Sequence, residues 1–180
     1  AASTGAELQA AVAAGVLAIS RYHGGAVEDG MKLFREVARR AAERAGPEAE
    51  AAREVLAEIK SRGERASGFG HRVHTRDPRT ARLFGLAEEL KLAGRHVGIA
   101  RTIERLFGEG GRPLPINVDG AIAALLCDLG LPPEIGNAFF IIARVPGLVA
   151  HIHEEKTRMR PMRKIHPADF EYDRPGERRP

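Results

Sequence analysis

The sequence predicts an all-α fold, and three observations support this prediction. Alanine, leucine, glutamate and arginine, which favour helices, are abundant among the 180 residues, whereas only 5% are aromatic. Helix start and stop signals recur at short intervals. No stretch alternates polar and apolar residues for long enough to propose a strand, and there is no internal repeat. With 43% hydrophobic residues, the chain can bury one sizeable core, or two small lobes that share a hinge.

The first helix signals lie near the N-terminus. Thr4 and Glu7 have the spacing of a capping box, which predicts a first helix over about 5–20. From Ala26 onward, apolar residues recur at helical spacing and predict a second helix. The chain opens on "AAST" without a methionine, within a helix entry, so we expect that an N-terminal portion is missing.

Proline and glycine mark the boundaries of the later helices. Pro47 suits the first turn of a third helix, which Gly63 would end. Asp77 and Pro78 predict a cap and a first-turn proline, at the start of a helix that runs to about Leu92. Further helices are predicted over about 96–107, 121–129, 134–144 and 146–159. Four prolines in the remainder predict an extended end.

Charge and apolar runs limit the compartment and the partners. The formal net charge of +4 is modest, and it permits acidic or phosphorylated partners without demanding them. No apolar run approaches the roughly 18–20 residues of a membrane span, and there is no signal-peptide pattern, so no membrane partner is predicted. Cys127 is the single cysteine, which excludes an internal disulfide and favours a cytoplasmic location. Its simplest interpretation is a small buried hydrophobe.

A basic end raises the alternative of a nucleic-acid-binding module. Its charged residues are Arg158, Arg160, Arg163 and Lys164. No aromatic stacking platform or recognised motif accompanies them, so no nucleic-acid partner is predicted. Steep salt dependence of binding to DNA or RNA would favour this alternative.

Polar side chains with catalytic potential lie where the predicted helices are interrupted. His23 stands in "HGGA", His71 in "GFGHRV" and Asp119 in "NVDG". Each lies close to glycine, where backbone can approach a ligand and amides can face an anion. Taken singly, such a histidine is usually a cap or a surface group, and Asp119 could simply cap the following helix. Their joint occurrence favours a catalytic site.

Other templates fit poorly. "GFGHRV" lacks the third glycine of a dinucleotide loop and follows no strand, and no Walker lysine pattern occurs. His151 and His153 point in different directions on a helix, and His71 and His74 lack an evident third ligand, so no metal is predicted. No serine stands in a nucleophile elbow.

Five linked motifs, in matching order and spacing, resemble the citrate synthase family. They are "HGGA", "GFGHRV" followed by "DPR", "NVDG", the later "AR...G...AHI" and "RMRP". The resemblance runs from about Ser3 to Arg163 and implies a multi-helix fold with a large and a small domain. The small domain would be 27–125. Residues 1–26 and 126–180 would belong to the large, dimer-forming domain, whose N-terminal part would be absent.

The resemblance implies a catalytic trio and a set of carboxylate-binding arginines. They map onto His23, His71 and Asp119, and onto Arg79, Arg144 and Arg160, respectively. Asp119 would be the base, His23 would support the thioester enol, and His71 would polarise the ketone of oxaloacetate. Arg160 would reach the neighbouring subunit's site, which implies a homodimer.

Elementary chemistry agrees with these assignments. Joining an acetyl thioester to a keto acid needs a base for a weakly acidic proton and donors for two oxygens that gain negative charge. One carboxylate and two imidazoles can fill these roles. Substrates with several carboxylates favour arginine, whose planar fork binds a carboxylate bidentately and stays charged.

The implied substrate is a coenzyme A thioester, and no tightly bound cofactor is expected. In the family, the adenine binds near the Gly-x-Gly-His loop. Gly68, Phe69 and Gly70 are therefore candidate coenzyme A contacts, with Arg72 and Arg76 as candidate phosphate partners.

Three departures from the family pattern bear on the reaction. Family members have a further substrate-binding histidine, upstream of the region that aligns with Ala1, and this chain lacks it. The loop from His71 to Asp77 is one residue shorter than in common synthases and carries His74 in place of an aromatic residue, and the ending "RPMRKIHPADFEYD" differs. The last two features resemble the short citryl-CoA lyase type, which cleaves citryl-CoA into acetyl-CoA and oxaloacetate.

The expected activity is therefore that of a citryl-CoA lyase or a citrate synthase, the latter with a place in the tricarboxylic acid cycle. Two alternatives stay open. One is activity of the 2-methylcitrate synthase type, and the other is a noncatalytic relative that binds acyl-CoA or a carboxylate.

Overall fold

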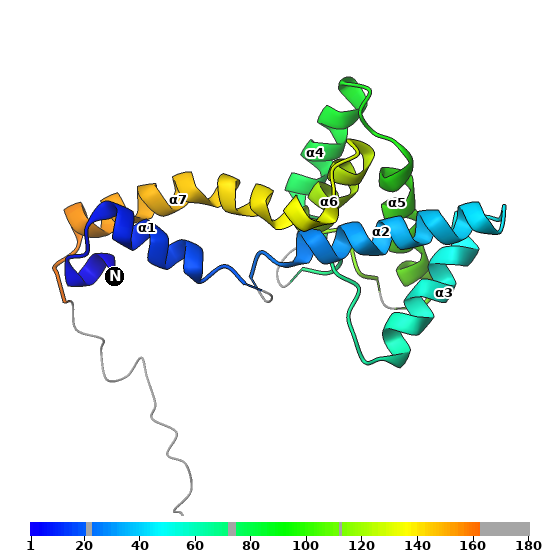
Figure 1. Ribbon diagram of the computed structural model, residues 1–180, viewed down its shortest axis with the longest axis horizontal. Helices are drawn as coiled ribbons and strands as arrows, with labels where there is room; N and C mark the ends of the chain where they lie inside the picture. The colour runs from blue at the N-terminus through cyan, green and yellow to red at the C-terminus, as the bar shows by residue number, and fades with distance from the viewer. Residues whose placement is uncertain (21–22, 72–74, 112, 163–180) are drawn as a thin grey trace, which may run out of the picture. The chain divides into compact units, whose positions relative to one another are not determined.

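The computed structural model describes residues 1–20, 23–71, 75–111 and 113–162 (Figure 1). The chain divides into two compact units, one formed by Ala18–Arg144 and the other by Ala1–Leu17 with Val145–Pro180. Within the described ranges, every regular element is helical, and extended pairing is limited to isolated bridges such as Phe69 with Ile116. The prediction of an all-α fold is confirmed.

The helices follow one another along the chain with short connections. Their bounds are η1 (Ala2–Thr4), α1 (Leu8–Leu17), α2 (Ala26–Glu43), α3 (Glu48–Ser61), α4 (Pro78–Glu89), α5 (Arg95–Glu109), α6 (Val118–Asp128), η2 (Pro133–Ile135) and α7 (Gly136–Arg158). Two predicted starts are confirmed, because α2 begins at Ala26 and α4 begins at Pro78, after Asp77 as its cap.

The predicted start of the first helix is wrong. The Thr4 hydroxyl donates to the Ala1 carbonyl at 2.8 Å, inside the short helix η1, and does not cap α1. Gly5, at a φ of 88°, ends η1 in the left-handed region, so α1 begins only at Leu8. The spacing of Thr4 and Glu7 satisfies the capping-box pattern, but Thr4 lies within η1, too far before Leu8 for its oxygen to accept from the first-turn N–H groups of α1.

The predicted break between 144 and 146 is also wrong. Helix α7 continues through Pro146 as a 23-residue helix. A proline inside a helix removes one backbone hydrogen bond, here to the carbonyl of Ile142, and the remaining turns on both sides can keep their own bonds. The residues of α7 up to Arg144 belong to one unit and those from Val145 onward to the other.

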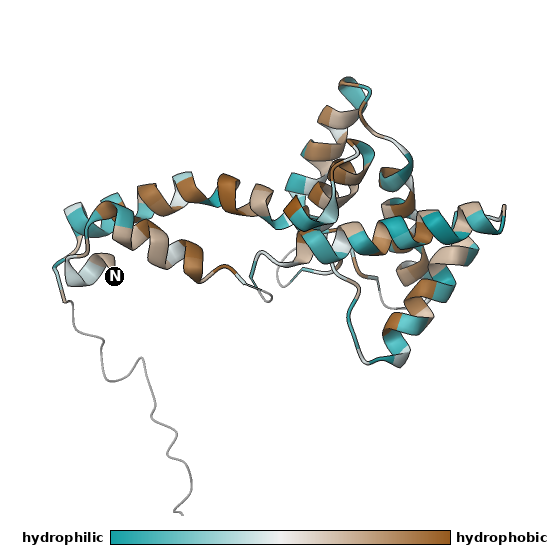
Figure 2. Ribbon diagram, in the orientation of Figure 1, coloured by the Kyte–Doolittle hydropathy of each residue, from teal (hydrophilic) through white to brown (hydrophobic). Residues whose placement is uncertain are grey.

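The core of the Ala18–Arg144 unit forms around α2. Apolar residues on one face of this helix are fully buried, among them Val27, Met31 and Phe34. They pack against α6, α3 and α5 (Figures 1 and 2). Gly30 of α2 allows a close approach to α6, because a Cβ there would lie 3.0 Å from that of Ala123.

Cys127 belongs to this core. Its side chain is 5% exposed, and its Sγ lies 3.6 Å from the Met31 carbonyl oxygen of α2. Burial raises the pKa of the thiol to about 11. The interpretation of Cys127 as a buried hydrophobe is confirmed, since a thiol of this pKa carries almost no thiolate at neutral pH.

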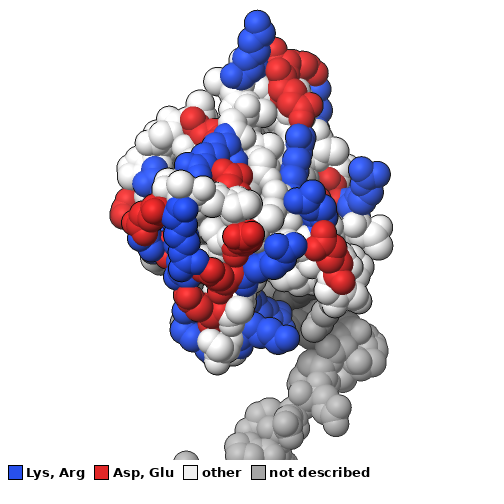
Figure 3. Space-filling model, turned by 90° about the vertical axis from the view of Figure 1, so that its right-hand side faces the viewer, with Lys and Arg blue, Asp and Glu red and all other residues white. Residues whose placement is uncertain are grey.

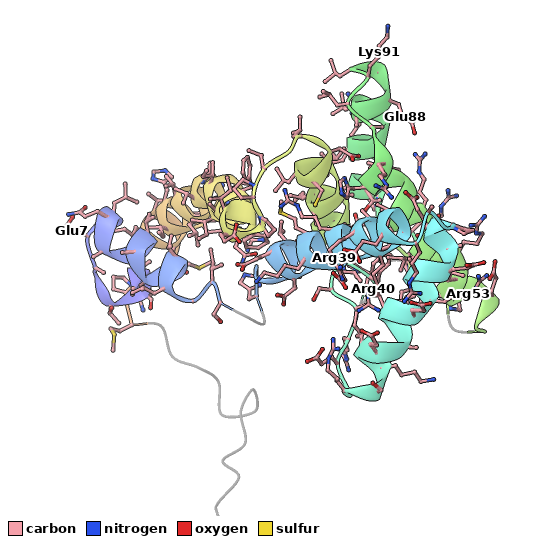
Figure 4. All side chains as sticks on the ribbon, turned by 45° about the vertical axis from the view of Figure 1, so that its right-hand side comes forward. Glu7, Arg39, Arg40, Arg53, Glu88 and Lys91 are labelled. Carbon is pink, nitrogen blue, oxygen red and sulfur yellow. The ribbon has the colours of Figure 1, made fainter. Side chains whose placement is uncertain are left out.

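The surface of this unit carries interspersed acidic and basic side chains (Figure 3). Arg39 and Arg40 project from α2 and Arg53 from α3 (Figure 4). Arg40 pairs with Glu36 of its own helix and with Glu58 of α3, each at 2.6 Å. The Arg40 side chain is only 18% exposed, and its pair with Glu58 links α2 to α3. Ion pairs near the surface each add only modestly to stability.

The segment Pro133–Arg158 is long and apolar enough to cross a membrane by length and composition alone, with a mean hydropathy of 1.5. The prediction that no apolar run approaches the length of a membrane span is wrong when mean hydropathy is the criterion. Arg144 interrupts the run, but one charged residue leaves the mean hydropathy of the window high. A single helix of this kind is weak evidence for a span, since core helices pass the same test. Only 11% of the apolar window is buried, and Ile142 is 67% exposed.

The expected small domain is 27–125, and the expected large domain is 1–26 with 126–180. These boundaries differ from those of the two compact units. Contacts within one chain define the units, whereas the domains follow from a family resemblance. The domain assignment therefore stays a prediction.

Candidate active site

His23 lies at the entrance of α2. Ser20 and His23 exchange backbone hydrogen bonds at 2.9 Å in both directions, which fixes the backbone of His23. Gly24 follows with a φ of 86°, and a Cβ there would lie 2.6 Å from the Phe140 ring. The glycine beside His23 is therefore required by backbone conformation and by the close approach of an aromatic ring.

Phe140 and Arg144, one turn apart on α7, flank the His23 imidazole. The Phe140 ring meets it edge to face, with centroids 5.5 Å apart and planes at 84°. The Arg144 guanidinium lies 4.8 Å from the Phe140 centroid, and its Nη1 is 3.3 Å from His23 Nε2. These contacts hold an exposed histidine and a cation side by side.

The loop of Gly68, Phe69 and Gly70 lies against the N-terminus of α6. Gly70 donates to the Pro115 carbonyl at 2.7 Å, and the backbone of Asn117 donates to the Gly68 carbonyl at 3.0 Å. The Asn117 side chain donates to the Gly70 carbonyl and accepts from Gly120, which caps α6. The loop that carries His71 and the helix that carries Asp119 are thus joined through backbone.

Glycines make this approach close. A Cβ on Gly120 would lie 2.2 Å from the Gly68 carbonyl oxygen, and a Cβ on Gly68 would lie 2.7 Å from the Gly120 Cα. Gly68 also has a φ of 90°, which side chains disfavour. The "NVDG" glycine is therefore a contact point between the segment that carries His71 and the helix that carries Asp119.

Asp77 and Arg79 lie next to His71. The Arg79 guanidinium donates to both Asp77 carboxylate oxygens, from Nε at 3.0 Å and from Nη2 at 2.9 Å. Arg79 Nη2 is also 3.5 Å from His71 Nε2. The guanidinium beside it lowers the pKa of Asp77 to about 2, against the effect of burial. Stability from this pair is present above pH 3.8, the ordinary value, and is lost as the pH falls through about 2.

Asp119 lies in the first turn of α6 with one carboxylate oxygen buried. Among the described residues, its Oδ1 is the one buried side-chain oxygen or nitrogen without a hydrogen-bond partner. Burial raises the pKa of Asp119, the positive charge of Arg79 lowers it, and the negative charge of Asp77 raises it. His23 and Arg144 also lower it. A desolvated carboxylate with an unused oxygen is well suited to accept a proton from a ligand.

The raised pKa of Asp119 predicts how activity depends on pH. A base works only when ionised, so activity should fall as the pH drops through the pKa of Asp119. We expect the acid limb of a plot of kcat/KM against pH to have its midpoint above the ordinary value of 3.8. A midpoint at or below 3.8 would contradict the role of burial at this carboxylate.

Five of the six residues predicted to act in catalysis or carboxylate binding lie in one unit. They are His23, His71, Arg79, Asp119 and Arg144. Asp119 interacts electrostatically with His23, Arg79 and Arg144, and Arg79 in turn contacts His71. The assignment of roles within this group stays a prediction.

The remaining predicted residues have different surroundings. Arg160 belongs to the other unit, Arg76 is exposed, and Arg72 lies outside the described residues, as does His74. The Phe69 ring packs edge to face against Phe34 and Phe107 in the core. A coenzyme A contact at Phe69 would therefore use its backbone.

Sequence reasoning missed three residues of this group. Asp77 was assigned only as a helix cap, Asn117 was assigned no role, and Phe140 was one of several apolar residues in a predicted helix. The motif "DPR" and the asparagine of "NVDG" could have signalled the first two, because a second polar group stood beside each predicted site residue. No local signal distinguished Phe140.

In the part of the chain that the structure describes, no group of three or more His, Cys, Asp or Glu residues could hold a metal ion.

Comparisons with known proteins agree on one family. The family model for the C-terminal domain of citrate synthase matches residues 1–168. "Putative citrate synthase 2" of Mycobacterium tuberculosis is 35% identical over 161 residues, which cover 86% of this chain and 41% of that protein. An ATP-citrate synthase beta chain of Arabidopsis thaliana is 28% identical over 178 residues, which cover 89% of this chain and 28% of that protein.

Solved structures give the same result. Citryl-CoA lyase from Hydrogenobacter thermophilus has a TM-score of 0.81 and 37% identity, with 99% of this chain and 68% of that chain covered. Citrate synthase from Thermotoga maritima has a TM-score of 0.72 and 28% identity, with 99% and 49% covered. This chain thus spans less than half the length of the curated relatives described above. Because the family model covers residues 1–168, the chain belongs to the citrate synthase family.

Proposed function

We propose that the protein makes or breaks the carbon–carbon bond between the acetyl group of acetyl-CoA and oxaloacetate. The observation that carries this proposal is the buried, unpartnered Oδ1 of Asp119. A carboxylate of raised pKa, near two guanidinium groups and an imidazole, suits abstraction of a proton from the methyl carbon of a thioester.

The reaction follows from the placement of polar groups around Asp119. In the direction of bond formation, Asp119 takes a proton from the acetyl methyl carbon, and His23 stabilises the enol oxygen that forms. The enol carbon attacks the ketone carbon of oxaloacetate, and His71 donates a proton to the ketone oxygen to give the citryl thioester. In the direction of cleavage, the same groups return these protons in reverse order.

Arg79 and Arg144 would bind carboxylates of the keto acid. Both lie near Asp119. Arg79 contacts His71, and Arg144 contacts His23. Guanidinium groups in these positions orient the substrate and offset its charge beside the base. Arg160 is proposed as a third carboxylate ligand, contributed by one subunit to the site of its neighbour.

Cleavage of citryl-CoA is the favoured direction. The short loop between His71 and Asp77 resembles the lyase type, and the lyase from Hydrogenobacter thermophilus has 37% identity and a TM-score of 0.81 to this chain. In the synthase direction, hydrolysis of citryl-CoA would yield citrate for the tricarboxylic acid cycle. Activity of the 2-methylcitrate synthase type would require room for one more methyl group on the acyl chain.

A coenzyme A thioester is the proposed substrate. The ATP citrate lyase of Methanothrix soehngenii, 26% identical with a TM-score of 0.77, was solved with citrate and coenzyme A. We assign the adenine to the backbone of Gly68, Phe69 and Gly70, with Arg72 and Arg76 toward the phosphates.

A cytoplasmic homodimer is the proposed form of the protein. Several apolar residues of α1 and α7 are exposed, including Leu17 at 83% and Ile142 at 67%. Hydrophobic residues recur along both helices (Figure 2). Within the Ala1–Leu17 and Val145–Pro180 unit, α1 and Val149 line an apolar groove. Large apolar surfaces of this kind favour a protein interface. The proposal also keeps a small domain at 27–125 and a large domain formed by 1–26 and 126–180.

The proposed function is tested by supplying citryl-CoA to this chain and to a version extended upstream, and by separating the products chromatographically. Acetyl-CoA with oxaloacetate indicates a lyase, whereas citrate with free coenzyme A indicates the hydrolytic step of a synthase. Activity of the extended version alone would mean that upstream residues complete the site. If neither version consumes citryl-CoA, the catalytic proposal fails and binding of acyl-CoA or a carboxylate becomes the better account.

A further inference from the structure

We propose that Asp77 is a positioning residue that holds Arg79 and the backbone at Val118 in one arrangement, so that the carboxylate-binding cation and the base Asp119 are presented together. This inference rests on the proposed function. It assigns to Asp77 a role beyond that of a helix cap.

The contacts of Asp77 converge from two segments of the site. Its Oδ1 accepts from the backbone N–H of Arg79 at 3.0 Å and from Arg79 Nε at 3.0 Å. Its Oδ2 accepts from Arg79 Nη2 at 2.9 Å and from the backbone N–H of Val118, next to Asp119, at 3.1 Å. One carboxylate thus binds the start of α4, a guanidinium and the start of α6.

A helix cap alone does not explain these contacts. A cap needs one acceptor for a backbone N–H of the first turn, and a serine or threonine supplies it. Asp77 is 3% exposed and is the one buried charged residue in the described part of the chain. Burying a carboxylate is costly unless several donors compensate, so its three further bonds are what make an aspartate suitable here.

Asp77 determines which edge of Arg79 is available to a ligand. Its carboxylate occupies the edge formed by Nε and Nη2, although the Arg79 side chain as a whole is 54% exposed. Nη1 makes no bond to Asp77, and Nη2 also lies 3.5 Å from His71 Nε2. A substrate carboxylate would then bind end-on, beside the imidazole assigned to the ketone.

Asp77 also sets part of the charge that Asp119 experiences. The groups that influence Asp119 are Asp77 before α4, Arg79 on α4, His23 before α2 and Arg144 on α7. Asp77 is the acidic member of this set, and its charge offsets that of Arg79. Removing its charge should lower the pKa of Asp119, because Arg79 would then act on Asp119 without compensation.

The test compares Asp77→Asn with the matched control Asp128→Asn in the intact protein. The Asp128 side chain is also largely enclosed, at 4% exposed against 0% for that of Asp77, and it accepts from Gly94, His96 and Val97 at the start of α5. Its partners do not include any residue of the site. Both variants lose a buried capping charge, so damage to stability alone should be similar in the two.

Two readouts separate positioning from stability. The first is the pKa of Asp119, followed by ¹³C NMR of its carboxyl carbon and assigned by the signal lost in Asp119→Asn. The second is the affinity for citrate, measured by calorimetry. In Asp77→Asn we expect the pKa of Asp119 to fall and citrate to bind about tenfold to a hundredfold more weakly, while Asp128→Asn changes neither. If Asp77→Asn does not fold, Asp77→Ser keeps the cap and replaces it in both measurements.

The outcomes decide the inference independently of turnover. An unchanged pKa of Asp119 in Asp77→Asn, or changes of equal size in Asp128→Asn, would overturn it even if the wild-type protein cleaves citryl-CoA. A specific fall in the pKa together with weaker citrate binding would support it. Absence of turnover in the wild type would instead overturn the proposed reaction, because neither readout requires chemistry.

Discussion

Replacing Asp119 with Asn should lower the turnover of citryl-CoA by about a hundredfold to ten-thousandfold, the range typical for loss of a general base. An amide has nearly the shape of the carboxylate but cannot accept the proton. Coenzyme A binding should stay largely intact, since its proposed contacts lie in the Gly68 loop. Steady-state kinetics with citryl-CoA and equilibrium binding of coenzyme A measure the two effects separately. Unchanged turnover would discard the mechanism.

The same substitution should make the protein more stable at neutral pH. Because the pKa of Asp119 is raised in the folded state, the folded protein binds this proton more tightly than the unfolded chain does. Ionisation above that pKa therefore costs stability, and the cost disappears as the pH falls below 3.8, the ordinary value. Thermal unfolding should show a gain for Asp119→Asn at pH 7 that shrinks toward pH 3.5. A loss of stability at pH 7 would mean that loss of folding, not of the base, explains inactivity.

Replacing Gly120 with Ala should destabilise the protein by about 3 kcal/mol or more and abolish activity. The new Cβ would lie 2.2 Å from the Gly68 carbonyl oxygen. The backbone fixes the positions of both atoms, so no side-chain rotation can relieve the clash. The Gly68 loop must move, which displaces His71 relative to Asp119. Chemical denaturation measures the first effect, and turnover at a temperature where the variant is folded measures the second.

Gly98→Ala is the matched control for this substitution. Gly98 also lies in a helix, α5, but a Cβ there meets nothing within 4 Å. Alanine is the better helix former, so this variant should gain up to about 1 kcal/mol and keep its activity. Equal losses in both variants would show that helix propensity, rather than the contact with Gly68, accounts for the Gly120 result.

The positions of helices were predictable wherever a local signal acts alone. Asp77 and Pro78 mark the start of α4, and the Arg79 N–H bonds to Asp77 at 3.0 Å as the cap pattern requires. The failures occur where two local options compete. Thr4 belongs to the short helix η1 instead of starting α1, and Pro146 is tolerated within a helix that continues on both sides. Pattern rules rank each option separately and cannot compare their free energies.

The candidate site was predictable as a set of residues but not as an arrangement. Motifs gave His23, His71 and Asp119, whereas the lack of a partner at Asp119 Oδ1 depends on packing between segments far apart in the chain. Asp119 itself also does not cap α6, because Asn117 holds that position. The second role of Asp77 likewise depends on Val118, 41 residues away.

Cys127 makes this core accessible to a simple chemical measurement. Cys127 is the one cysteine of the chain, and its thiol projects from α6 against the Met31 carbonyl of α2. With its pKa raised to about 11, it should react with an alkylating reagent only when α2 and α6 separate. The rate of modification therefore reports how often α2, which follows His23, separates from α6, which carries Asp119. No probe has to be introduced for this measurement.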